Sequence, residues 1–133
     1  MTFGFAVECT RGHADKEGMP FRPLVLIMDD DPVMREVLAA HFNAHGGFRI
    51  TGIAADGFEG AMIACDVTPD VVVIDYNMPR WDGERAASFI RDRYPWTRIV
   101  VFSAVVDDKP EWADEYLPKA KIDDLVPLVE SLT

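Results

Sequence analysis

The chain has 133 residues, 49% of them hydrophobic, which suits one compact domain with its own core and is too short for two ordinary domains. Thirteen basic and twenty-three acidic side chains give a formal net charge of −10, which argues against direct binding to nucleic acid or to a membrane surface. No segment approaches the ~18 unbroken apolar residues of a membrane span. The N-terminus lacks the basic region followed by an apolar region that is typical of a signal peptide. We therefore expect a cytoplasmic protein whose partners are proteins or metal ions.

Residues 1–22 are interpreted as an N-terminal tail ahead of one domain at residues 23–133. The tail shows no helical or strand periodicity and carries several glycines, so it is either disordered or docks as a short strand through its apolar residues at 3–7. The two cysteines, Cys9 and Cys65, lie far apart without CxxC spacing, which argues against a disulfide framework or a zinc site. We expect Cys65 to be a small core residue.

Apolar segments along the first three quarters of the chain predict four strands. These segments cover residues 24–28, 48–55, 71–75 and 98–102. The continuous runs LVLIM and VVVI suit strands that are covered on both faces, as in a parallel sheet with helices above and below. The 48–55 segment alternates between apolar and polar residues and is expected nearer the edge of the sheet.

Amphipathic segments between these strands predict helices. The expected helices are bounded by Asp31 and Gly46, by Asp56–Gly57 and Thr68–Pro69, and by Asp82 and Pro95. In the second of them, we expect Phe58, Ala61, Met62 and Cys65 to mark the buried face. Strand and helix thus alternate with short connections, a pattern typical of a doubly wound parallel sheet with right-handed crossovers.

The last part of the chain is less regular. Residues 115–118 predict a brief fifth strand, which Pro118 restricts to an edge of the sheet because proline cannot donate to a strand ladder. A closing helix fits if Asp123 or Asp124 caps it, since Pro127 then falls in the first turn. Its apolar side consists of Leu125, Val126, Val129 and Leu132.

Polar residues follow the predicted strands at the edge where ligands bind in open α/β sheets. They are Asp29 and Asp30, Asp75, Ser103 and Lys119. Clustered carboxylates repel one another, so at neutral pH this arrangement favours a divalent cation among them. Oxygen ligands with positions left for water suit Mg²⁺. A lysine and a hydroxyl across the site then suit a phosphoryl group.

The motifs LIMDDDP, VVVIDYNMPRWDG, VVFSA and YLPKA occur in this order over residues 24–132. In these motifs the chain resembles a response-regulator receiver domain of two-component signalling. The first two motifs together are highly specific, whereas the last two alone are weak. The resemblance implies a flavodoxin-like fold, in which a five-stranded parallel sheet of order 2-1-3-4-5 carries helices on both faces.

The resemblance also implies a role for each matching residue. Asp75 resembles the phosphoacceptor, and Asp29 and Asp30 resemble the acidic pair that holds Mg²⁺ together with it. Asn77 matches the residue whose backbone carbonyl completes the metal shell, and Lys119 matches the family's lysine. Ser103 matches the hydroxyl that moves to meet the phosphate, and Tyr116 matches the switch aromatic. The implied donor is a sensor histidine kinase or phosphotransfer protein. The domain would catalyse at most its own phosphorylation and dephosphorylation, and would signal by contact with a downstream protein partner.

The chain departs from the family pattern between Ser103 and Lys119. Residues 105–114 leave room for one or two helical turns starting at Pro110, so the fourth helix is expected to be shortened or missing. Ala120 replaces the proline that usually follows the lysine, and the shortened segment leaves nearby Lys121 as an alternative. This edge either serves an unusual partner, including a phosphorylation-linked homodimer, or is a loop without a special role.

Two rival functions stay open. The run Asp29-Asp30-Asp31-Pro32-Val33 fits the start of haloacid-dehalogenase-like phosphatases, which would make Asp29 the nucleophile and Asp31 the acid/base but leaves Asp75 without a role. The other rival is a receiver-like module that binds a partner without phosphorylation. Whether the domain is phosphorylated or only binds a partner, we expect a stand-alone regulator, because the sequence adds no output domain after Thr133.

Overall fold

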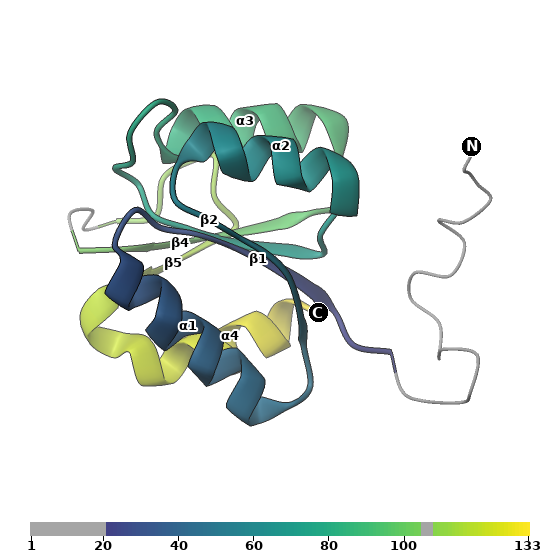
Figure 1. The fold of residues 1–133 in the computed structure, drawn as a ribbon, viewed down its shortest axis with the longest axis vertical. Coiled ribbons are helices and arrows are strands. Elements are labelled where there is room, and N and C mark those ends of the chain that lie inside the picture. Colours follow the sequence, from purple (N-terminus) through teal and green to yellow (C-terminus); the bar gives the residue numbers. More distant parts are fainter. Residues whose placement is uncertain (1–20, 105–107) are drawn as a thin grey trace.

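A five-stranded parallel sheet forms the centre of the protein in a computed structural model that describes residues 21–104 and 108–133 (Figure 1). Neighbouring strands pair in the order β2-β1-β3-β4-β5, which confirms the predicted order. The strands are β1 (Leu24–Met28), β2 (Arg49–Ala54), β3 (Val71–Ile74), β4 (Arg98–Ser103) and β5 (Glu115–Pro118). Except for Phe21 and Arg22, the predicted tail lies outside the described residues.

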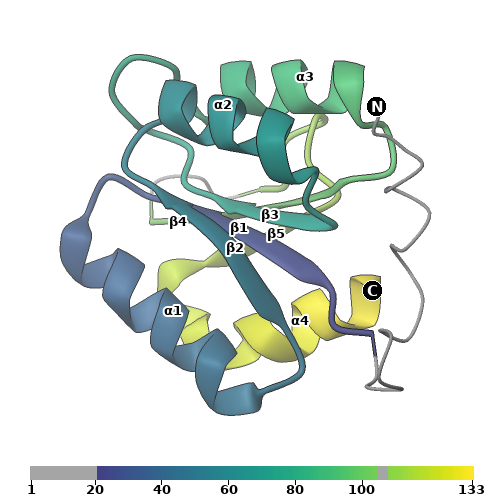
Figure 2. The same cartoon turned by 45° about the vertical axis from the view of Figure 1, so that its right-hand side comes forward.

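Helices cover both faces of the sheet. Figures 1 and 2 show α1 and α4 on one face and α2 and α3 on the other. Their bounds are Pro32–His45 for α1, Gly57–Val67 for α2, Gly83–Arg93 for α3 and Leu125–Leu132 for α4. The fold is therefore the doubly wound arrangement that the strand and helix pattern predicts, in the flavodoxin-like form that the family resemblance implies.

The two sheet faces form two separate parts of the core. Along β1, Val25 and Ile27 pack with Phe42 of α1 and Val129 of α4. Leu26 and Met28 of β1 pack on the α2 and α3 side. Successive side chains of a strand point to opposite faces, so a strand covered by helices on both sides needs an unbroken apolar run.

Three helices begin at aspartates that cap their first turns. The caps predicted at Asp31 and Asp82 are present, and their carboxylates accept hydrogen bonds from Val33 N at 3.0 Å and Arg85 N at 2.9 Å. Asp56, which the sequence analysis gives only as a boundary of this helix, caps α2 in the same way through Glu59 N at 2.8 Å. A cap satisfies an N–H group that has no partner inside the helix, which is why these carboxylates mark the helix starts.

Small residues form the buried face of α2, which corrects the predicted face. Gly60 packs against Met28, whose side chain lies 2.2 Å from where a Cβ atom on Gly60 would stand. Ala61 and Ala64 are buried on the same side. Cys65 is exposed, so its predicted core position is wrong. The helix lies so close to the sheet that only small side chains fit between them, so residue size and not hydrophobicity decides which face of α2 is buried.

No α-helix lies between β4 and β5 among the described residues, as expected from the shortened segment; residues 105–107 lie outside that range. Residues 110–113 form a single turn, in which Ala113 N donates to Pro110 O at 3.1 Å. Asp114 then holds the segment to the sheet, since its Oδ2 accepts hydrogen bonds from Ile99 N at 2.7 Å and Arg91 Nη2 at 2.8 Å. The fifth strand follows directly at Glu115, as predicted.

The start of the last helix differs from the prediction. A 3₁₀ helix, η2 (Lys119–Asp124), leads into α4, and Asp124 occupies the N-cap position without a capping hydrogen bond from its side chain. Leu125 N donates to Ile122 O instead. Because η2 supplies carbonyl partners for the first N–H groups of α4, no aspartate side chain is needed there.

Asp56 provides a test of the helix caps. Its carboxylate also accepts hydrogen bonds from Arg80 Nε at 3.1 Å and Nη2 at 3.0 Å. Burial alone would raise the pKa of Asp56, but the hydrogen bonds from Glu59 N–H and Arg80 outweigh burial and lower it. We expect Asp56→Ala to lower the free energy of unfolding by about 1–2 kcal/mol at neutral pH, measured by urea denaturation.

The control for this prediction is Asp56→Asn, which keeps a capping oxygen but not the charge. A carboxyl group whose pKa is lowered by folding stabilises the fold above its unfolded pKa and loses that contribution as the pH falls through its folded pKa. The stability difference between the natural chain and Asp56→Asn should therefore shrink as the pH is lowered toward about 3. A difference that stays constant with pH would show that the Arg80 ion pair adds no stability.

Candidate active site

The carboxyl ends of four strands bring most of the predicted site residues to one place. Met28 pairs with Ile74 in the β1–β3 ladder, so Asp29 and Asp75 follow neighbouring strand ends. Ser103 pairs with Pro118 in the β4–β5 ladder, so Lys119 follows at the same edge. The sheet register therefore places Asp29, Asp75, Ser103 and Lys119 together, as the strand pattern predicts.

Lys119 joins two of the carboxylates directly. Its Nζ lies 2.8 Å from Asp29 Oδ2 and 2.9 Å from Asp75 Oδ2. Asp29 is 1% exposed and Asp75 is 8% exposed, so both carboxylates are largely removed from water. Two buried acids on one lysine leave an excess of negative charge, which makes the site suited to a further cation.

The pKa values of the buried groups reflect this arrangement. Burial raises the pKa of Asp29, and the close contact with the Lys119 ammonium, the hydrogen bond from Asp31 N and the charge of Lys119 only partly offset that effect. For Lys119, burial alone would lower the pKa, but Asp29 and Asp75 together outweigh burial and raise it. The ammonium group thus stays charged, while ionised Asp29 is held at a cost in free energy.

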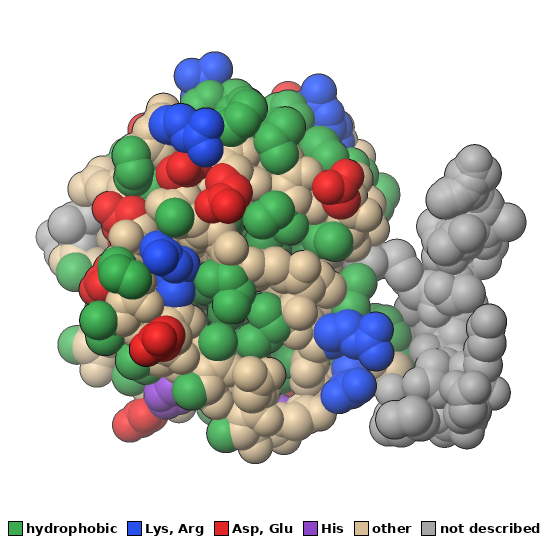
Figure 3. All heavy atoms as spheres, viewed as in Figure 1, with side chains coloured by type: hydrophobic (Ala, Val, Ile, Leu, Met, Phe, Trp, Pro, Cys, Tyr) green, Lys and Arg blue, Asp and Glu red, His purple; other side chains and the backbone are tan. Residues whose placement is uncertain are grey.

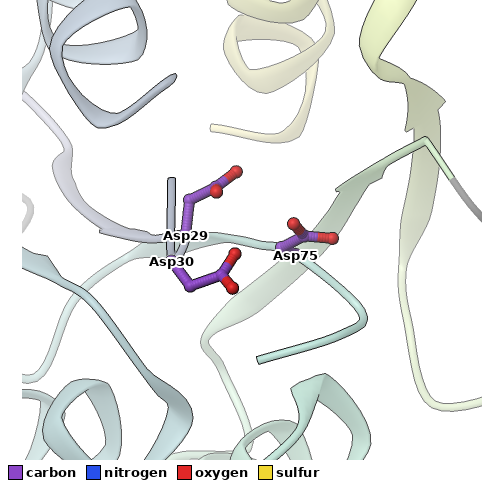
Figure 4. A group of neighbouring side chains, drawn as sticks. All are labelled: Asp29, Asp30 and Asp75. Carbon is purple, nitrogen blue, oxygen red and sulfur yellow. The ribbon is translucent and has the colours of Figure 1, made fainter. Parts of the chain in front are cut away.

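The acidic cluster fits a divalent cation. Carboxylate oxygens of Asp29, Asp30 and Asp75 lie within 4.8 Å of one another, and Asp30 is exposed on the open side of the cluster (Figure 4). Asp29 Oδ2 is buried and its contact with Lys119 is poorly aligned for a hydrogen bond, so this oxygen lacks a well-placed donor. Carboxylate oxygens with one solvent-facing side match the ligand preference of Mg²⁺.

Asn77, Ser103 and Tyr116 complete the predicted set. Asn77 is exposed two residues beyond Asp75, and the metal-ligand role of its backbone carbonyl stays a prediction. Ser103 is buried at the end of β4. Strand alternation puts Ser103 on the same sheet face as Val101, against which Tyr116 of β5 is also packed. The hydroxyl and the aromatic ring therefore share the face covered by α2 and α3.

Gly57 and Gly83 hold the loop after Asp75, a role that the sequence patterns do not predict. Gly83 N donates to Tyr76 O at 2.7 Å, and a Cβ atom on Gly83 would stand 2.5 Å from Asp75 O. Gly57 N donates to Trp81 O at 3.1 Å, where a Cβ atom would stand 2.1 Å from the same oxygen. Both positions exclude any side chain because backbone packs on backbone. In the sequence, the one feature that points to these two glycines is that each directly follows an aspartate that caps a helix.

Two arginines near the site were also missed. Arg35 Nη1 donates to the backbone carbonyl of Asp29 at 2.9 Å, which fixes the turn between β1 and α1. Arg80 adopts a left-handed backbone conformation with φ 65° in the loop after Asp75, and its side chain binds Asp56 at the start of α2. These contacts join segments distant in the sequence, so residue spacing gives no sign of them.

Comparison with known proteins agrees with this geometry. The sequence profile of the family described as "Response regulator receiver domain" matches residues 25–127. Protein-glutamate methylesterase/protein-glutamine glutaminase 3 of Hahella chejuensis is 42% identical over 80 residues, which cover 60% of this chain and 22% of that protein. The transcriptional regulatory protein LiaR of Bacillus subtilis is 34% identical over 84 residues, which cover 63% of this chain and 40% of that protein. The chain thus matches less than half of the length of these curated relatives.

Solved structures show the same fold. The receiver domain of the Francisella response regulator 1452 superposes with a TM-score of 0.73 at 31% identity, covering 84% of this chain and 96% of that chain. The response regulator domain of Thermotoga maritima CheB gives a TM-score of 0.72 at 25% identity, covering 84% of this chain and 93% of that chain. The chain belongs to the response regulator receiver domain family of two-component signalling.

Proposed function

We propose that Asp75 accepts a phosphoryl group, with Mg²⁺ bound beside it, from a phosphohistidine of a sensor histidine kinase or phosphotransfer protein. The observation that carries this proposal is the ammonium of Lys119, which lies within 3 Å of carboxylate oxygens of both Asp29 and Asp75 at neighbouring strand ends. Asp30 lies close by on the exposed side. The signal then leaves the domain by contact with a downstream protein.

The proposed reaction is an in-line displacement. A carboxylate oxygen of Asp75 attacks phosphorus, a carboxylate O–P bond forms as the P–N bond to histidine breaks, and the released imidazole takes up a proton from solvent. Lys119 stands where charge collects on the transferring oxygens. A Mg²⁺ ion held by Asp29, Asp30, Asp75 and the Asn77 carbonyl would neutralise more of this charge. Water later hydrolyses the acyl phosphate.

Phosphorylation is proposed to act on the fold through charge. The phosphoryl group adds negative charge and hydrogen-bond acceptors beside Ser103, whose hydroxyl is drawn toward it. Tyr116 packs on the same face of the sheet and is proposed to move into the space behind the hydroxyl. The added charge thereby biases an equilibrium between two conformations and changes a binding surface.

The partners are proposed to be proteins. On the face drawn in Figure 3, acidic and basic side chains are interspersed rather than separated into a basic stripe. The formal net charge of −10 is unfavourable for a nucleic acid partner. No helix within residues 21–104 and 108–133 is long and apolar enough to cross a membrane. Phosphorylation-linked homodimerisation is one output mode consistent with this proposal.

The geometry favours Asp75 over Asp29 as the nucleophile. A phosphatase of the rival family would need Asp31 as its acid/base, but the Asp31 carboxylate accepts a hydrogen bond from Val33 N and serves as the cap of α1. Asp29 is the more deeply buried of the two candidate nucleophiles. A receiver-like module that binds without phosphorylation remains the second candidate, because the segment between β4 and β5 departs from the usual form of the family.

Incubation with acetyl phosphate and Mg²⁺ tests the proposed acceptor. We expect the intact mass to rise by one phosphoryl group, and fragmentation after borohydride reduction to place the modification on Asp75. Asp75→Asn should remove this modification, whereas Asp31→Asn, which keeps a capping oxygen, should retain it. Modification at Asp29 would support the phosphatase instead, and no modification at saturating donor would support the binding module.

Mg²⁺ should stabilise the fold by binding the acidic cluster, and at about 100 times the dissociation constant the gain is about 2.7 kcal/mol. Asp29→Asn should abolish this gain.

Because folding raises the pKa of Asp29, the stability that this group contributes to the fold is present below its unfolded pKa and is lost as the pH rises through its folded pKa. In EDTA at neutral pH, Asp29→Asn should therefore melt a few degrees higher than the natural chain.

Asp31→Asn is the matched control for this measurement, because it removes a neighbouring charge outside the cluster. It should melt close to the natural chain in EDTA and keep the gain from Mg²⁺. If Asp29→Asn also keeps that gain, the cation does not bind through Asp29.

A further inference from the structure

An aromatic stack closes the shortened segment between β4 and β5 over the sheet. The rings of Trp112 and Tyr76 lie nearly parallel, with centroids 6.0 Å apart and an interplanar angle of 18°. Trp112 is half-buried and packs against the core on the α2 and α3 side of the sheet. In the absence of a helix here among the described residues, this indole provides much of the cover.

Trp112 is held firmly from its own side. Arg91 Nη2 reaches the backbone carbonyl of Trp112 at 3.5 Å and binds Asp114 Oδ2 at 2.8 Å. Asp114 is in turn bonded to β4, since its N donates to Ile99 O at 2.8 Å and its Oδ2 accepts from Ile99 N at 2.7 Å. The backbone at Trp112 is thus tied to α3 and, through Asp114, to β4, while its indole ring contacts Tyr76 in the loop that follows Asp75.

Tyr76 directly follows the proposed phosphorylation site. It lies between Asp75, the proposed acceptor, and Asn77, the proposed source of a metal-ligating carbonyl. Asp75 N donates to Met28 O at 3.0 Å, and Gly83 packs against the Asp75 carbonyl, so the backbone at Asp75 has little room to adjust. Tyr76 is bonded directly to Asp75 and Asn77, so a change in charge or ligation at either of them acts on the backbone unit that carries its ring.

We propose that the Tyr76–Trp112 stack regulates the phosphorylation site: it is formed while Asp75 is a free carboxylate held by Lys119, and it loosens when a phosphoryl group occupies Asp75. This proposal rests on the proposed acceptor role of Asp75. The stack is distinct from the pair formed by Ser103 and Tyr116, and it uses residues of the segment in which this chain departs from its family. Coupling of this kind is reciprocal, so loss of the stack should favour the modified form.

Fluorescence of a single tryptophan tests the first half of the proposal. The double variant Trp81→Phe/Trp96→Phe leaves Trp112 alone, and beryllofluoride with Mg²⁺ serves as the phosphoryl mimic. We expect the Trp112 emission to change with the same concentration dependence as the mimic-induced rise in melting temperature, and to stay constant in an added Asp75→Asn variant. Trp81→Phe/Trp112→Phe leaves Trp96, which is 57% exposed and whose emission should not respond.

Affinity for the mimic tests the second half. Trp112→Leu should lower the apparent dissociation constant for beryllofluoride about two- to tenfold, the range expected for one aromatic pair. Trp96→Leu makes the same chemical change at an exposed site and should leave that constant unchanged. Melting curves of both variants establish that each remains folded.

The outcomes separate this proposal from the function on which it rests. If the mimic raises the melting temperature while Trp112 emission stays constant, or if Trp112→Leu binds it no more tightly than the natural chain, the regulatory role of the stack is overturned and the acceptor role stands. If the mimic has no effect on the melting temperature of the natural chain, the acceptor role itself fails.

Discussion

The ion pairs of Lys119 with Asp29 and Asp75 are the interaction on which the rest of the site depends. They join the ends of β1 and β3 to the residue that follows β5, so they span four neighbouring strands at the functional edge of the sheet. Two largely buried carboxylates would repel each other strongly without this ammonium. With it they retain excess negative charge, which the fold tolerates at a cost and which a cation can relieve.

Backbone packing gives this charged cluster its rigidity. Gly57 and Gly83 let the loop after β3 lie directly on the start of α2 and on the end of β3, and Arg80 adds a side-chain link to Asp56. The acceptor carboxylate therefore stands on a loop held from two sides. Positioning of this kind suits phosphoryl transfer, in which catalysis depends mainly on geometry and electrostatics.

The described residues between β4 and β5 include no α-helix, and side chains cover this part of the core instead. Trp112 supplies apolar area, and Asp114 satisfies a backbone N–H group of β4 and pairs with Arg91 of α3. A receiver in which residues 108–114 form no α-helix presents a different surface at this edge. Specificity for a partner at this edge would then depend on aromatic and charged side chains in a loop rather than on a helix face.

The local pattern of the sequence determined the five strands, the order in which they carry polar residues, and the helix starts at Asp31 and Asp82. These features follow from periodicity and capping, which act over a few residues. The predicted strand ends placed Asp75, Asp29, Asp30 and Lys119 at one edge, and the sheet register brought these residues together as expected.

Only the tertiary structure decided which residues pack and which side chains meet across long separations. Cys65 lies outside because α2 approaches the sheet through glycine and alanine, and Asp124 makes no cap because η2 already supplies the carbonyl partners. The contacts of Arg35 with Asp29 and of Trp112 with Tyr76 depend on how separate elements are placed. Close packing and non-local hydrogen bonds arise from the assembled fold, so no local pattern encodes them.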